Sequence, residues 1–177
     1  LYLSDKELQA GTTLWSSQPG RKKIIVSTGA GFPEKCWPVD KFKKLAEKLA
    51  DRDDTELLFL GSKKDEADGE ALANAIPRLL NLAGRTTLRE TIAAVSCADL
   101  VVCNTTMFMH VAAAFEVPTL VMLGPWYDSA QLHRDQWGHP CCTILGPETA
   151  QGRDRLATVQ DAFEHCVQIL GQATQVS

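Results

Sequence analysis

The sequence lacks the patterns that define several common classes of protein. No run of apolar residues approaches the roughly 18 that a membrane-spanning helix needs. No stripe of basic residues offsets the formal net charge of −4, which argues against nucleic-acid binding. Neither the P-loop pattern G-x-x-x-x-G-K-[ST] nor the dinucleotide pattern G-x-G-x-x-G occurs. Function therefore has to be inferred from weaker patterns and from their order along the chain.

The cysteines also exclude some chemistry. Six are present, but no two have the C-x-x-C spacing of zinc or thioredoxin-like sites. Cys141 and Cys142 are adjacent and cannot easily bridge to each other. We therefore expect reduced thiols, no metal ion, and a cytoplasmic location.

Length and composition are those of one globular domain. The chain has 177 residues, of which 45% are hydrophobic and 23% charged. It begins with Leu1 rather than Met and shows no signal-peptide pattern, so we expect that it was cut from a longer protein. Residues 1–21 are interpreted as a linker and peripheral segment with a helical turn or two, and residues 22–177 as the domain.

Short apolar runs alternate with amphipathic segments along that domain. Strands are predicted at 23–28, 56–60, 80–82, 100–103, 119–123 and, at an edge of the sheet, 142–145. Helices are predicted at 39–51, 63–76, from a Thr87 cap to about 96, at 107–115 and at 156–170. The segment 127–140 has no clear period and is predicted to be a loop. The alternation predicts an α/β, Rossmann-like parallel sheet with helices on both faces.

The segment 98–125 organises the chain as strand, tight turn, helix and strand. Asn104, Thr105 and Thr106 supply capping side chains at the turn. The first turn of the following helix then lies at the carboxyl end of the sheet, where its N–H groups favour an anion. We interpret this turn as half of a phosphate-binding site.

The loop from Gly29 to Lys35 is the second half of that hypothesis, because it follows the first core strand. Its glycines allow close approach of the backbone to a ligand, and Lys35 adds a cation that can pair with phosphate. Alternatively, the glycines only form the turn and Lys35 is a solvated surface charge.

Two further residues have competing interpretations. His110 either hydrogen-bonds to a phosphate oxygen or is a satisfied histidine of the apolar core. Asp65 either accepts both hydroxyl groups of a ribose or only stabilises the first turn of its helix.

An ordered set of motifs carries a resemblance to a known family. They are G-A-G-F-P-E-K-C-W-P, L-G-S-K-K-D, N-L-A-G-R-T-T-L, V-V-C-N-T-T-M-F-M-H-V-A-A-A and V-P-T, with Gly124-Pro125 after them. The set resembles the heptosyltransferases of bacterial lipopolysaccharide synthesis, glycosyltransferase family 9, from about residue 22 to residue 125. The resemblance implies the C-terminal, donor-binding half of a GT-B glycosyltransferase.

The resemblance also implies roles for single residues. Lys35 would contact the donor diphosphate, Asp65 the ribose, and the turn at Thr106 together with His110 the phosphates. Residues 85–88 would border the base. The implied donor-binding residues are Gly29, Ala30, Lys35, Asp65, Thr86, Thr105, Thr106, Met107 and His110. No catalytic residue is assigned, because the general base is expected in the missing N-terminal domain.

The implied reaction is a metal-independent, inverting transfer from a nucleoside-diphosphate sugar, most specifically ADP-heptose, to a lipopolysaccharide-type acceptor. The partners would be that donor, the missing acceptor domain and at most a peripheral membrane contact, without nucleic acid. The isolated chain is expected to be inactive. Thr105 and Met107 take the Asp and Gly positions of the family turn, which supports an alternative: a non-catalytic module used for protein association. A third hypothesis is another nucleotide-binding α/β protein, such as half of a sugar-nucleotide epimerase.

Overall fold

One parallel sheet forms the centre of the molecule. The computed structural model describes residues 1–15, 20–147 and 156–172. Within these residues six parallel strands have the order β3-β2-β1-β4-β5-β6, which is the doubly wound order of Rossmann folds. The strands are β1 (Lys22–Ser27), β2 (Thr55–Phe59), β3 (Leu80–Asn81), β4 (Leu100–Cys103), β5 (Thr119–Met122) and β6 (Cys142–Leu145).

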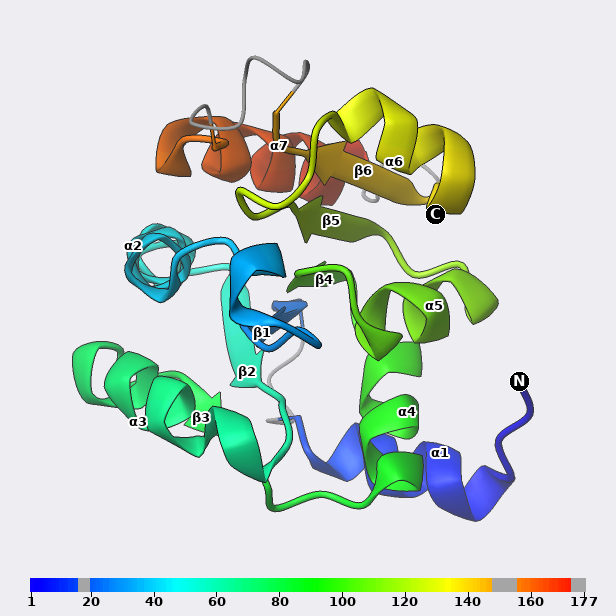
Figure 1. The fold of residues 1–177 in the computed structure, drawn as a ribbon. Coiled ribbons are helices and arrows are strands. Elements are labelled where there is room, and N and C mark those ends of the chain that lie inside the picture. Colours follow the sequence, from blue (N-terminus) through cyan, green and yellow to red (C-terminus); the bar gives the residue numbers. More distant parts are fainter. Residues whose placement is uncertain (16–19, 148–155, 173–177) are drawn as a thin grey trace.

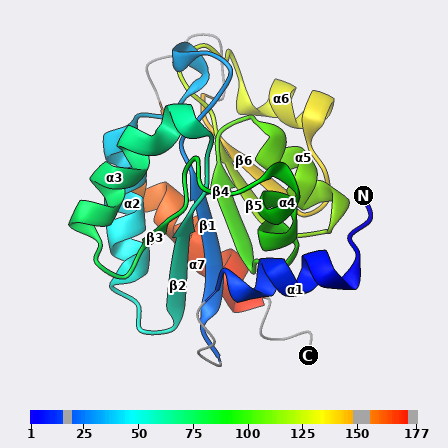
Figure 2. The ribbon, with the colours of Figure 1, turned by 90° about the horizontal axis from the view of Figure 1, so that it is seen from below.

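Helices cover both faces of this sheet, as Figures 1 and 2 show. One face carries α2 (Val39–Ala50), α3 (Glu66–Ala75) and α7 (Val159–Gln172). The other carries α1 (Asp5–Thr13), α4 (Leu88–Ser96), α5 (Met107–Ala114) and α6 (Ala130–Trp137). Short 3₁₀ turns, η1 (Pro33–Lys35) and η2 (Lys63–Asp65), follow β1 and β2. The predicted α/β, Rossmann-like architecture is confirmed.

Burial on both faces explains why the strands read as apolar runs. Alternate residues of a strand point to opposite faces, so Ile24 packs under α2 and α7 while Ile25 packs under α4 and α5. Both side chains are fully buried, as are all four residues of β4. The predicted bounds of β4 and β6 agree with the structure, and β6 does form an edge of the sheet.

Several helix predictions hold because their local signals are strong. The apolar stripe of α2 is buried, and Thr87 caps α4 in a reciprocal capping box with Glu90. The predicted helix 63–76 begins instead with the 3₁₀ turn η2, and the closing helix begins at Val159 rather than at 156.

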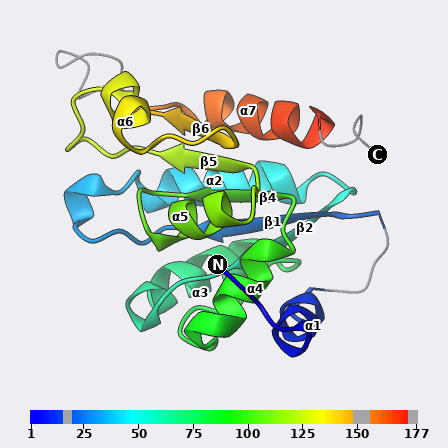
Figure 3. The same cartoon turned by 90° about the vertical axis from the view of Figure 1, so that its right-hand side faces the viewer.

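The N-terminal segment contributes to the core. Helix α1 packs against α4, and Leu3 and Trp15, on either side of it, are 6% and 4% exposed. An exposed ion pair between Arg89 of α4 and Glu7 of α1 joins the two helices. Figure 3 shows α1 beside α4, on the face of the sheet opposite α2.

The prediction of a loop over 127–140 is wrong, because α6 occupies residues 130–137. Ser129 caps this helix by accepting hydrogen bonds from the N–H groups of Gln131 and Leu132. Only Ala130 and His133 are buried in it, so the helix has almost no apolar stripe for a sequence pattern to show.

One buried side chain fastens the loops at the carboxyl edge of the sheet. Asn104 follows β4 and is fully buried. Its amide donates to the carbonyl oxygen of Thr28 (2.6 Å) and accepts from the N–H of Trp37 (2.9 Å). Asn104 therefore bridges other segments and does not cap α5, whose cap is Thr106.

We predict that Asn104→Ala lowers the free energy of unfolding by about 2–4 kcal/mol, because two buried backbone groups lose their partners. Urea unfolding of the parent and the variant measures this change. Asn74→Ala, at an exposed position of α3, is the matched control and should change stability by less than about 0.5 kcal/mol. Equal effects of the two substitutions would contradict the bridging role.

Candidate functional site

The loops after β1 and β5 are held together at the carboxyl edge of the sheet. The N–H of Gly124 donates to the carbonyl oxygen of Lys35 (3.2 Å), and that of Trp126 donates to Glu34 (3.0 Å). A Cβ atom at Gly124 would lie 2.5 Å from the carbonyl oxygen of Cys36, so only glycine fits there. Lys35 is thus fixed at its backbone by the loop that precedes α6.

Asp65 sits where the loops after β1 and β2 approach each other. Its Oδ2 accepts from the N–H (2.7 Å) and the hydroxyl group (2.8 Å) of Ser62, as in a capping box at the start of η2. A Cβ atom at Gly29 would lie 2.5 Å from Oδ1, and one at Gly61 would lie 2.8 Å from the Asp65 Cβ. The absence of side chains at both glycines leaves room for this carboxylate.

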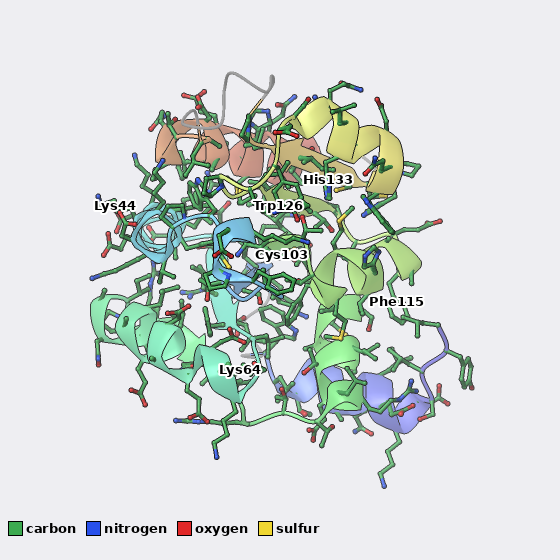
Figure 4. The ribbon with its side chains drawn as sticks, viewed as in Figure 1. Lys44, Lys64, Cys103, Phe115, Trp126 and His133 are labelled. Carbon is green, nitrogen blue, oxygen red and sulfur yellow. The ribbon has the colours of Figure 1, made fainter. Side chains whose placement is uncertain are left out.

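One cavity at this edge, of about 480 Å³, is bordered by Asp65; we call it the Asp65 cavity. Six predicted donor-binding residues line it: Gly29, Ala30, Asp65, Thr86, Thr106 and Met107. Lys64 and Ser62 also line it, although the sequence analysis did not select them. Figure 4 labels Lys64 near the start of α3. Another cavity, of about 610 Å³, shares Gly29, Asp65 and Lys64 and is walled elsewhere by residues that include 36–39.

A neighbouring cavity of about 560 Å³ lies under α6 and is called here the α6 cavity. It contains the other three predicted residues, Lys35, Thr105 and His110. His110 is exposed, so its interpretation as a core histidine is wrong. Its ring meets that of Trp137 edge-to-face, with 5.9 Å between the centroids.

Thr105, Tyr127 and His133 form a neutral part of the α6 cavity, whose lining also includes Lys35 and Asp128. The Thr105 hydroxyl lies 3.1 Å from Nε2 of His133. Burial lowers the pKa of His133 below its ordinary 6.5, and electrostatic repulsion from Lys35 and His110 lowers it further. Burial raises the pKa of Tyr127. Both side chains are therefore neutral at pH 7.

Aromatic rings surround the Lys35 ammonium group at the mouth of the α6 cavity. The Nζ atom lies 4.4 Å from the ring centroid of Trp126 and 5.6 Å from that of Phe32. Trp126 is 57% exposed and lines the same cavity as His133; both are labelled in Figure 4. Lys35 is thus held by ring faces at the edge of a cavity rather than solvated on an open surface.

The sequence analysis missed the residues of this cavity that come from 126–137. Tyr127, His133 and Trp137 lie in the segment 127–140, which is predicted to be a loop, and Trp126 immediately precedes it. Their composition was a usable signal, because aromatic and histidine residues concentrated after a buried parallel strand favour a binding site.

Two features are absent from the described residues, namely a metal-binding cluster and a membrane-spanning helix. Within residues 1–15, 20–147 and 156–172, no group of three His, Cys, Asp or Glu side chains is placed to hold a metal ion. Over the same ranges, no helix has the length and apolarity required to cross a membrane.

The strand order and the cavities at the carboxyl edge define a class: an α/β domain of the kind that binds nucleotides at its topological switch point. Comparison with protein families identifies the member of this class. Residues 2–129 match the model of glycosyltransferase family 9 (heptosyltransferase), and the chain belongs to this family.

Relatives with curated names agree with this assignment. The chain is 41% identical over 136 residues to a lipooligosaccharide heptosyltransferase 2 of Haemophilus influenzae, and this match covers 70% of the chain. It is 32% identical over 130 residues to lipopolysaccharide heptosyltransferase 2 of Escherichia coli, covering 71% of the chain. These matches cover only 39% and 37% of the two relatives.

Solved structures show the same relationship. The structure of E. coli ADP-heptose lipopolysaccharide heptosyltransferase II matches 98% of this chain with a TM-score of 0.79 and 26% identity. An E. coli heptosyltransferase with ADP matches 92% with a TM-score of 0.70, at 17% identity, and supports the fold alone. The matched parts are 54% and 48% of those chains, so this chain spans about half of a heptosyltransferase.

We predict that Gly29→Ala destabilises the chain by roughly 1–2 kcal/mol, because the added Cβ displaces the Asp65 carboxylate from its capping bonds. Gly31→Ala is the matched control, since a Cβ at Gly31 meets no atom within 4 Å. Thermal unfolding compares the two variants, and the amide NMR signal of Ser62 reports the capping bond. A shift of that signal in both variants, or in neither, would disprove the steric argument.

Stability should also depend on the protonation of His133. Its pKa is lower in the folded chain than in the unfolded chain, so the unfolded state takes up the proton first as the pH falls. The free energy of unfolding should therefore decrease from pH 7.5 to pH 5.5, and less steeply in His133→Gln. Carboxyl groups with lowered pKa values, such as Glu7, contribute to pH dependence only below about 4.5. Urea unfolding at each pH gives the free energy of unfolding. The same dependence of this free energy on pH in both proteins would rule out this role of His133.

Proposed function

We propose that this chain is the donor-binding domain of an inverting GT-B glycosyltransferase that acts in lipopolysaccharide core synthesis. The donor would be a nucleoside-diphosphate sugar, most specifically ADP-heptose. One observation carries the proposal: all nine residues selected from the sequence border two cavities at the carboxyl edge of the sheet, one on each side of the turn between β4 and α5. The printed names of its relatives, heptosyltransferase 2 and ADP-heptose heptosyltransferase II, supply the identity of the donor.

The arrangement suits a donor with two ends joined by a diphosphate. Thr105 borders the α6 cavity and Thr106 borders the Asp65 cavity, so the turn between β4 and α5 separates the two. The nucleoside would occupy the Asp65 cavity, with the carboxylate near the ribose hydroxyl groups. The diphosphate would lie at the turn, where the first N–H groups of α5 have no acceptor within the helix.

The proposed catalytic role of this domain is to stabilise the negative charge that develops on the leaving group. As the glycosyl bond breaks, the bonding electrons move to the departing nucleoside diphosphate, whose negative charge increases. The Lys35 ammonium group and the N–H groups of α5 would stabilise this charge more strongly than that of the intact donor. We propose that no metal ion is needed, and that the general base and the acceptor site belong to an N-terminal half outside this chain.

The proposal includes a location. Six cysteines are present and all are free thiols, which fits a reducing compartment such as the cytoplasm. The acceptor would be of the lipopolysaccharide type, reached by at most a peripheral contact with a membrane. Because the general base and the acceptor site are proposed to belong to an N-terminal half outside this chain, this chain alone should bind the donor without transferring the sugar.

We predict that Lys35→Ala weakens the binding of ADP about tenfold or more, because a cation next to the diphosphate is removed. Thermal stability should be almost unchanged, since the Lys35 ammonium group is only partly buried among ring edges and faces. Isothermal titration calorimetry of the parent and the variant with ADP measures the effect.

Lys44→Ala provides the control, because Lys44 is an exposed residue of α2 whose ion pair with Asp40 is at the surface. It should bind ADP as the parent does. Heat of binding from UDP but not from ADP would require a different base in the donor. No heat with ADP, UDP or their sugars would overturn the donor-binding proposal and favour the non-catalytic module.

A further inference from the structure

His133 is placed to contact a ligand and not only to support the fold. It comes from the second turn of α6 and lines the α6 cavity, yet only 6% of the residue is exposed. Its Nε2 atom lies 3.1 Å from the Thr105 hydroxyl, and the Tyr127 ring meets its ring edge-to-face with 4.9 Å between centroids. The ring is therefore held in one orientation by contacts on two sides.

The groups beside His133 can both donate and accept hydrogen bonds without carrying charge. A hydroxyl group such as that of Thr105 has one donor and two acceptor positions, and a neutral imidazole has one of each. A ligand that offers hydroxyl groups can join such a chain of bonds at either end.

Two tryptophan side chains give the α6 cavity flat apolar walls. The indole rings of Trp126 and Trp137 are 57% and 55% exposed, and both line the cavity. Flat apolar faces beside a few fixed polar groups suit a ring whose faces are C–H groups and whose rim is hydroxyl groups. A neutral sugar has this character.

The cavity also begins at the correct point for the sugar of a donor. Thr105 immediately precedes Thr106, the N-cap of α5, which is the proposed position of the diphosphate. With the nucleoside in the Asp65 cavity, the sugar bonded to the distal phosphate would lie on the α6 side of the turn, in the cavity that Lys35 also lines.

We propose that His133 and Thr105 form the specificity-determining pair of this domain and bind hydroxyl groups of a neutral donor sugar in the α6 cavity. The inference rests on the proposed donor-binding function. It predicts that the pair contributes to binding of the sugar and not to binding of the nucleoside diphosphate. The affinity for ADP-heptose divided by that for ADP is therefore the quantity that tests it.

The experiment is isothermal titration calorimetry of this chain with ADP and with ADP-heptose at pH 7.5. The parent should prefer ADP-heptose. His133→Phe keeps a ring but removes the hydrogen bond, and should reduce the preference about tenfold while the affinity for ADP stays unchanged. His133→Gln, which can place an amide near the position of Nε2, should restore part of the preference. His165→Phe, on α7 at the opposite face of the sheet, is the matched control and should behave as the parent.

A second variant keeps the test decisive if His133→Phe does not fold. Thr105→Val preserves the shape of the side chain, removes the hydroxyl group and should lose the preference to the same extent. An unchanged preference in Thr105→Val and in any folded His133→Phe would overturn the inference. ADP binding without any preference for ADP-heptose in the parent would also overturn it, while leaving the nucleotide site standing. Failure of both ligands to bind would overturn the proposed function itself.

Discussion

The buried amide of Asn104 is the contact on which the site depends. It bonds to the backbone of Thr28 and of Trp37, which lie just before and just after the loop of residues 29–35. Both ends of that loop are thereby tied to the turn that starts α5. Without this link, the glycine-containing loop and the helix start would be two unrelated features of the same edge. Because Asn104 is fully buried, the two bonds are shielded from competition by water.

From this link the rest of the site follows by packing. The loop after β5 is bonded to the backbone of Glu34 and Lys35, which brings Trp126 against the Lys35 ammonium group. Helix α6 continues from the same loop and closes a cavity on one side of the turn. Asp65, held by Ser62, borders a cavity on the other side. The two cavities therefore lie on the two sides of one turn, as the proposed donor, with two parts joined by a diphosphate, requires.

Most of the fold could be predicted from sequence, and the exceptions have physical reasons. Strands buried on both faces, such as Leu100–Cys103, are continuous apolar runs and were located to the residue. Helix α6 was missed because it buries a histidine and an alanine, so no apolar period reveals it. Asn104 was read as a cap, because a side chain that bridges residues far away in the sequence cannot be distinguished locally from one that caps a helix. The same limit hid His133, whose contact with Thr105 spans 28 positions.

A crystal structure of this chain with ADP would test the central claim most directly, namely that the two loops joined by Asn104 converge on one diphosphate. The account predicts adenosine in the Asp65 cavity and phosphate oxygens within hydrogen-bonding distance of both the Lys35 ammonium group and the first N–H groups of α5. Phosphates that contact neither group, or only one of them with the other facing solvent, would contradict it.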